Sequence, residues 1–211
     1  MRHRAEHFFT KEEKERIAKT TGEVETRTIG EIVVMVVDRS DEYPDGEIVG
    51  GVLFGSLLAV VLTALFFHSS MWFFISLSFV FFFPFRIILK KYPPLRTAFL
   101  AARRREHAVR HRAVMAFHEK GLNRTKGHTG VLFFISLLEH KVWVLADKGI
   151  HEKIGQDTLN KFAAKVSSGI REGRACDALC ESIKEAGDLL AAHFPMKPGD
   201  TDELPNHVIT D

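Results

Sequence analysis

The sequence predicts an α/β domain that is interrupted by a transmembrane helical hairpin, and three observations lead to this fold class. The chain has 211 residues, of which 27% are charged, yet residues 48–85 contain no Asp, Glu, Lys or Arg. This uncharged run also holds 10 of the 18 phenylalanines. Patterns typical of buried strands and amphipathic helices lie on both sides of it. Such segregation excludes an ordinary soluble single domain.

The uncharged run is long enough for two membrane-spanning helices. One span needs about 20 apolar residues, so the 38 positions of the run are too many for one span and suit two. The polar residues 68–70 divide it into a first span near 47–67 and a second near 71–89. A buried soluble hairpin is the alternative, but soluble helices of this length carry a polar face, and these two do not.

Lysines and arginines follow the second predicted span in a dense run, whereas the loop between the spans has none. The positive-inside rule places such a run in the cytoplasm. Because two spans return the chain to its starting side, both termini are expected there. We expect the basic cluster nearest the membrane to attract anionic lipid headgroups; nucleic-acid binding is the alternative that this position disfavours. The cluster consists of Arg86, Lys90, Lys91, Arg96, Arg103, Arg104 and Arg105.

The segment before the hairpin predicts one helix and one strand. Thr10 and Glu13 have the spacing of a capping box, which places the start of a charged helix over residues 11–25. Residues 31–38 form a nearly unbroken apolar run rich in β-branched residues, typical of a strand covered on both faces. The polar residues 39–45 then predict a loop.

The segment after the hairpin predicts three helices and two strands. A long helix over 95–120 carries its apolar residues on one face and ends at Gly121. Residues 131–137 and 141–146 are strands that we expect to pair antiparallel. The last two helices place apolar residues at helical spacing, at Leu159, Phe162, Val166 and Ile170, and then at Leu179, Ile183, Ala186 and Leu190.

The first strand has to be completed by the segment beyond the hairpin, because a lone strand cannot bury both of its faces. We therefore expect residues 1–46 and 90–194 to form one domain and residues 47–89 to form the hairpin that interrupts it. The two-span topology allows this arrangement, since it places both segments on the same side. The proline-rich, acidic tail 195–211 predicts an extended segment or one ordered only by docking.

Three aspartates are candidates for a metal site, although aspartate also favours strand ends and turns. Asp38 and Asp41 follow the first strand, and Asp147 follows the third. Ligands of open α/β sheets bind beyond the carboxyl ends of strands, and carboxylates there suit Mg²⁺ or Ca²⁺. If the first and third strands run in opposite directions, Asp147 lies at the other edge. The sequence shows none of the common hydrolase or nucleotide-binding motifs, so no catalytic residues are assigned.

Three further groups have spacings that suit a site, and each also has a simpler interpretation. A histidine stripe lies opposite the apolar face of its helix, which is typical of solvated histidines rather than metal ligands. A cysteine pair shares the face of its apolar neighbours, which indicates core packing. A glycine pair allows close helix packing, either inside the hairpin or between two copies. The groups are His107, His111 and His118; Cys176 and Cys180; and Gly51 and Gly55.

Four segments carry a recognisable pattern: residues 30–37, 129–136, 141–150, and 193–195 with 202–206. They resemble, in this order, the first strand of the TPM domain family, its Asn-Gly-Val-Leu strand, its following strand with a glycine turn, and the ending of a bacterial membrane-attached branch. The family includes thylakoid-lumen acid-phosphatase-like proteins and photosystem II repair factors. The resemblance covers nearly all of the chain outside 48–94.

The resemblance implies a three-layer α/β/α sandwich with a small mixed sheet, a bacterial origin and attachment to the envelope; the charge rule then favours the inner (plasma) membrane. Some family members are reported as phosphatases or bind divalent cations. We expect a non-catalytic interaction, assembly or quality-control factor that contacts membrane lipids and a membrane-protein partner, with no nucleic acid. The alternatives are a membrane-bound phosphatase that depends on Mg²⁺ or Ca²⁺, and an anionic-lipid-binding module. A homo-oligomer is left open.

Overall fold

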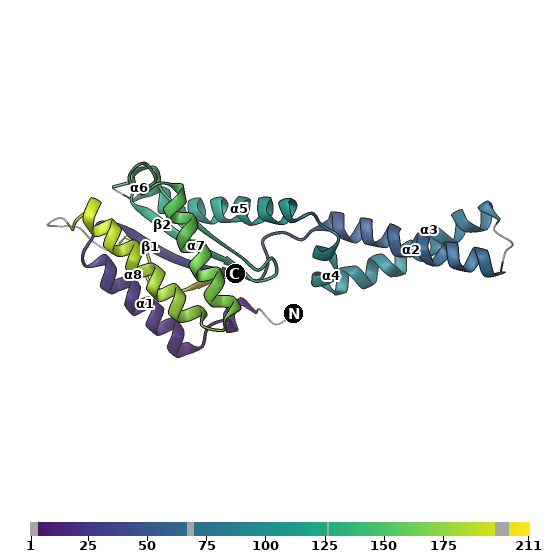
Figure 1. Cartoon of the computed structure of the whole chain (residues 1–211), viewed down its shortest axis with the longest axis horizontal. Coiled ribbons are helices and arrows are strands. Elements are labelled where there is room, and N and C mark those ends of the chain that lie inside the picture. Colours follow the sequence, from purple (N-terminus) through teal and green to yellow (C-terminus); the bar gives the residue numbers. More distant parts are fainter. Residues whose placement is uncertain (1–3, 67–69, 126, 197–202) are drawn as a thin grey trace. The chain divides into compact units, whose positions relative to one another are not determined.

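The computed structural model describes residues 4–66, 70–125, 127–196 and 203–211 (Figure 1). The chain divides into two compact units. The first unit joins the two ends of the chain, Met1–Ser40 and Ala108–Asp211, and the second is the intervening segment Asp41–His107. The first unit therefore draws its strands from both sides of the hairpin.

In the described part of the first unit, four strands form a mixed sheet in the order β3-β2-β1-β4. β1 (Glu31–Val37) and β2 (Gly130–Ser136) pair in parallel along their full length. β3 (Lys141–Ala146) runs antiparallel to β2, as the short connection between them predicts. β4 (Ile209–Thr210) joins the other side of β1 in parallel.

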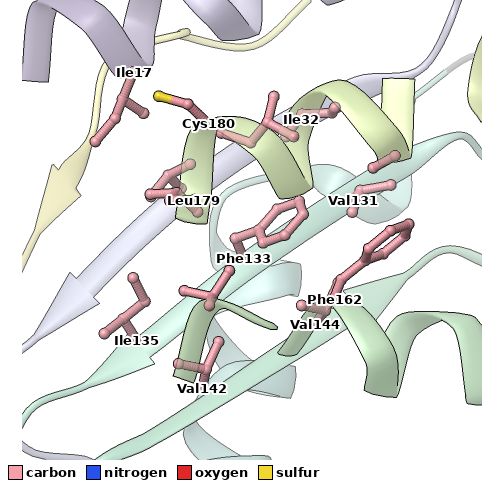
Figure 2. Packing of buried hydrophobic residues seen from close by; sticks show 14 of the residues in the cluster. Ile17, Ile32, Val131, Phe133, Ile135, Val142, Val144, Phe162, Leu179 and Cys180 are labelled. Atoms are coloured by element: carbon pink, nitrogen blue, oxygen red, sulfur yellow. The ribbon is translucent and has the colours of Figure 1, made fainter. Parts of the chain in front are cut away.

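One face of the sheet is covered by α1 (Lys11–Glu25), α6 (Lys148–Ile154), α7 (Gln156–Arg171) and α8 (Ala175–His193). The core between them packs β-branched strand residues around larger side chains such as Phe133, Phe162 and Leu179 (Figure 2). The predicted capping box is confirmed at the start of α1. The backbone N–H of Glu13 donates to the Thr10 hydroxyl at 3.2 Å, and that of Thr10 donates to the Glu13 carboxylate at 2.8 Å.

The other face is covered by the part of α5 (Ala102–Glu119) that belongs to the first unit. Successive strand residues point to opposite faces of the sheet. Because helices cover both faces, β1 and β2 are buried along their whole length. The predicted α/β/α sandwich with a small mixed sheet is thus confirmed. The second core contains Val33, Met35, Val37, Val109, Ala113, Ala116, Phe117, Leu122, Leu132 and Phe134.

The second unit contains the predicted hairpin of two long helices. They are α2 (Pro44–Phe66) and α3 (Met71–Lys91), which pack against each other. α2 begins inside the predicted loop, because Pro44 suits the first turn of a helix, where its missing N–H has no partner to lose. Residues 68 and 69 of the predicted turn lie outside the described residues.

The single helix expected over 95–120 is wrong. The structure has a short helix α4 (Pro93–Ala98) and then α5, with residues 99–101 between them. Phe99 packs edge to face against Phe54 of α2, with ring centroids 5.5 Å apart. This contact holds the end of α4 against the hairpin, so tertiary packing overrides helix continuity. Gly121 follows α5 with a φ of 78°, as the predicted stop requires.

Two elements were not expected as such. Asp147, which follows β3, begins α6, since its carboxylate accepts a hydrogen bond from the Lys148 backbone N–H at 2.7 Å. The end of the acidic tail is ordered by docking as β4. The backbone N–H of Asp211 donates to the Val36 carbonyl at 3.1 Å, and Arg112 binds the Asp211 carboxylate.

Candidate membrane interface

The two long helices of the second unit expose their apolar side chains. In the most apolar stretch of α3, 6% of the residues are buried, and in that of α2, 28%. A core helix of a soluble protein buries most of its residues, so these helices lack the partner that their composition requires. Both are long and apolar enough to cross a membrane, and they are compatible with two spans. Trp72, Met71 and Leu65 are the most exposed of the large hydrophobic residues that the structure describes.

The glycine pair lies in the seam between α2 and α3. A Cβ added to Gly51 would lie 3.2 Å from the ring of Phe82, and one added to Gly55 would lie 3.0 Å from the Phe82 backbone nitrogen. Ala59, one turn further along, is fully buried. Of the two interpretations that the sequence left open, these contacts favour packing inside the hairpin.

A buried ion pair connects the start of α2 to α4. The Arg96 guanidinium donates to the Glu47 carboxylate at 2.8 Å, and the two residues are 5% and 7% exposed. Arg96 also donates to the Glu42 carbonyl at 2.7 Å. The prediction that Arg96 belongs to the lipid-facing basic cluster is therefore wrong, because its charge is enclosed and paired.

A second ion pair connects the start of α2 to the start of α5. The Arg104 guanidinium donates to the Asp41 carboxylate at 2.8 Å and lies 3.8 Å from that of Asp45. It also lies over the ring of buried Tyr43, 5.8 Å from its centroid. Asp41, a predicted metal ligand, thus pairs with an arginine. The sequence could not reveal these partners, because they lie far apart along the chain.

The remaining members of the basic cluster are exposed or half-buried. Arg86 lies 3.9 Å from the Glu47 carboxylate, a distance that makes only a weak pair. Within the described residues, the other four have no carboxylate partner. They are Lys90 and Lys91 in the last turn of α3, and Arg103 and Arg105 in the first turns of α5.

The three predicted metal ligands are not brought together. Asp38 follows β1, where its carboxylate accepts a hydrogen bond from the Ala5 backbone N–H at 2.6 Å. Because β3 runs opposite to β1, Asp147 lies at the other end of the sheet, 3.1 Å from Nδ1 of His128. Among the described residues, no group of three or more His, Cys, Asp or Glu side chains is placed to hold a metal ion.

A polar network at the carboxyl ends of β1 and β2 has no distinct signal in the sequence. The Ser40 hydroxyl bonds the Ser136 hydroxyl at 2.8 Å, and Ser136 in turn donates to the buried Glu139 carboxylate. The Ser40 backbone N–H donates to the same carboxylate at 3.1 Å. These hydrogen bonds connect the segment after β1 to the β2–β3 turn. Glu139 gave no signal in the sequence beyond an ordinary turn position.

The histidine stripe and the cysteine pair differ in their exposure to solvent. His107, His111 and His118 are exposed along α5. Cys176 and Cys180 are free thiols buried in the first core. Burial raises the pKa of the Cys176 thiol from 9.0 to about 12, and the neighbouring Cys180 adds to the rise. A thiol with this pKa is not a nucleophile at neutral pH.

These features define a mixed α/β sandwich that carries a pair of apolar helices. No protein-family model matches the chain, and no curated protein matches it. Among solved structures, the chain is similar to the BA42 protein of the psychrophilic bacterium Bizionia argentinensis, determined by NMR. The TM-score is 0.61, the match covers 97% of this chain and 96% of that one, and 21% of the residues are identical.

At this identity the likeness shows the fold alone. BA42 is a TPM-like domain protein. The fold of this chain is therefore TPM-like, in agreement with the fold that the sequence resemblance implies.

Proposed function

We propose that the chain is an integral protein of a bacterial inner membrane, in which α2 and α3 span the bilayer and the α/β sandwich is held beside it. The observation that carries the proposal is the pairing of β1, which precedes the hairpin, with β2, which follows it. Two paired strands lie on one side of a membrane, so the chain between them crosses an even number of times. The two exposed apolar helices supply two crossings.

The charge distribution supports a cytoplasmic position for the sandwich. No lysine or arginine occurs in residues 48–85, whereas Lys90 and Lys91 end the second helix and more arginines follow. Positive charge next to a span stays in the cytoplasm. The turn after α2 then faces the outside, and both termini face the inside.

Cysteine labelling in spheroplasts tests this placement. The native thiols are buried, so a membrane-impermeant maleimide should leave them unmodified. Ser70→Cys, at the start of α3, should be labelled in intact spheroplasts, and Lys161→Cys, on the exposed side of α7, only after lysis. The opposite pattern would reverse the orientation. Labelling of both in intact cells, or release of the protein by carbonate, would refute the two-span anchor.

We propose further that the sandwich is a non-catalytic assembly or quality-control factor for envelope proteins. Support comes from the combination of a TPM-like fold with an apolar hairpin, as in the membrane-attached branch that the sequence resembles. The outer side of α5 offers two exposed apolar residues, Val114 and Met115. A photocrosslinking residue at Met115 should capture a membrane protein in living cells, whereas one at Lys161 should not. Equal capture from both positions would contradict the proposal.

The phosphatase alternative has its own assay. Detergent-solubilised protein is incubated with Mg²⁺ or Ca²⁺ and a phosphomonoester, with Asp38→Ala as the comparison. We expect no turnover above background in either protein. Metal-dependent turnover that disappears in Asp38→Ala would refute the non-catalytic role and assign Asp38 to an active site.

A further inference from the structure

We infer that the four basic residues Lys90, Lys91, Arg103 and Arg105 bind the phosphate groups of anionic phospholipids in the cytoplasmic leaflet. They are called the unpaired cations below. The inference rests on the proposed function, because it needs the hairpin to lie in a bilayer. It goes further by naming the lipid class and by separating these residues from neighbouring arginines that have a structural role.

The acidic residues near the start of α2 distinguish the unpaired cations from the neighbouring arginines. The Glu47 carboxylate pairs with the Arg96 guanidinium at 2.8 Å. The Asp41 carboxylate pairs with the Arg104 guanidinium at 2.8 Å, and that of Asp45 lies 3.8 Å from it. These pairs use the carboxylates at, and just before, the start of α2. Over the described residues, the unpaired cations have no hydrogen bond or ion pair from their side chains to a carboxylate.

The pairs also hold the unpaired cations at one end of the hairpin. Arg104 ties the first turn of α5 to the start of α2. Arg96 ties α4 to the start of α2, and its guanidinium also approaches the Lys90 carbonyl at 3.4 Å, at the end of α3. Lys90, Lys91, Arg103 and Arg105 are therefore displayed together, at the end of the hairpin where both helices meet the charged part of the chain.

Their position along α3 matches the boundary between hydrocarbon and headgroups. Ile87 and Ile88 are 68% and 47% exposed, and the two lysines follow after the buried Leu89. Tyr92 comes next and is half exposed, and an amphipathic ring is favoured at this depth. The change from apolar to basic side chains therefore falls at the proposed membrane surface. A phospholipid with a net negative headgroup fits this surface, because its acyl chains contact the apolar residues and its phosphate contacts the basic ones.

The expected selectivity follows from charge. A zwitterionic headgroup carries its own ammonium group, whereas phosphatidylglycerol leaves its phosphate charge uncompensated. Each basic residue near an anionic surface strengthens association by about fivefold. The preference for the anionic lipid should weaken at high salt, because Lys90, Lys91 and Arg103 are exposed to solvent and their charges are screened.

Native mass spectrometry of the detergent-solubilised full chain tests the inference. The chain is titrated with phosphatidylglycerol or with phosphatidylcholine, and the association constant of each lipid is obtained from the bound fractions. We expect phosphatidylglycerol to bind more tightly. Lys90→Gln with Lys91→Gln should lower this preference by about fivefold for each lysine, and Arg103→Gln with Arg105→Gln should act in the same direction.

The matched control is Lys153→Gln with Lys161→Gln. It removes the same charge from exposed positions of α6 and α7, and the preference should be unchanged. Equal binding of the two lipids, or an equal loss in the control, would overturn the inference. Displacement of phosphatidylglycerol by a short RNA at equal concentration would also overturn it. Failure of the proposed function would appear separately, in the labelling and carbonate experiments, because lipid selectivity in detergent does not depend on orientation.

Discussion

The packing of α1 against α8 depends on Gly187, which leaves room for Val24. A Cβ added to Gly187 would lie 2.3 Å from Cγ1 and 2.7 Å from Cγ2 of Val24, where ordinary contact begins at 3.4 Å. Gly187→Ala must therefore push the two helices apart by about 1 Å in a close-packed core. Overpacking of this severity costs about 3 kcal/mol, and the better helix propensity of alanine returns about 1 kcal/mol. We expect a net loss of about 2 kcal/mol.

Urea unfolding of the full chain in detergent measures this loss. In a Trp72→Phe background, fluorescence of Trp143 on β3 reports the sandwich alone. Gly22→Ala is the control, since a Cβ at that position of α1 meets its nearest neighbour at 3.5 Å and should stabilise by up to about 1 kcal/mol. In a Val24→Ala background, only the Cβ of residue 24 remains, 3.0 Å from the added Cβ, so Gly187→Ala should cost much less. If it destabilises equally in both backgrounds, the packing explanation is refuted.

Three other predictions concern the seam, the buried pair and the thiol. Gly55→Leu should lower the melting temperature of the hairpin in detergent, because the Phe82 backbone blocks a side chain, whereas Leu57→Ala on the exposed side should not. Glu47→Gln should cost about 3–5 kcal/mol by leaving the buried Arg96 charge without a carboxylate partner. Glu47→Leu with Arg96→Leu should recover most of this loss, as measured by proteolysis near 99–101. Cys176 should resist iodoacetamide at pH 8. With its pKa raised from 9.0 to about 12, it should make unfolding easier as the pH rises through that window, since only the unfolded thiol ionises near pH 9.

Local patterns predicted most of the sandwich. The capping box fixed the start of α1 at Lys11, and the apolar runs located β1, β2 and β3 within one residue. These features depend on residues within one turn or one strand, so the sequence displays them directly. The sequence does not display the interruption between α4 and α5, because that interruption depends on the contact of Phe99 with Phe54, 45 positions earlier.

The partners of the charged residues also could not be predicted from local patterns. Asp41 and Arg104 are 63 positions apart, and Glu47 and Arg96 are 49 apart, so charge patterning alone suggested a metal ligand and a lipid contact where the structure has two ion pairs. Asp38 and Asp147 each follow a strand, but the strand direction decides whether they meet. The antiparallel course of β3 separates them, and Asp147 instead caps α6.

The position of the hairpin in the chain follows from the topology of the sheet. Neighbouring parallel strands cannot be joined by a tight turn; they need a crossover connection of a dozen or more residues, usually a helix. β1 and β2 are such a pair, and the final part of their crossover is α5, which covers one face of the sheet. A hairpin inserted before α5 lengthens a connection that is already long, and loop-closure entropy grows only slowly with length. The sheet therefore keeps its register while the crossover carries two apolar helices, and the proposed membrane attachment requires no change in the sandwich itself.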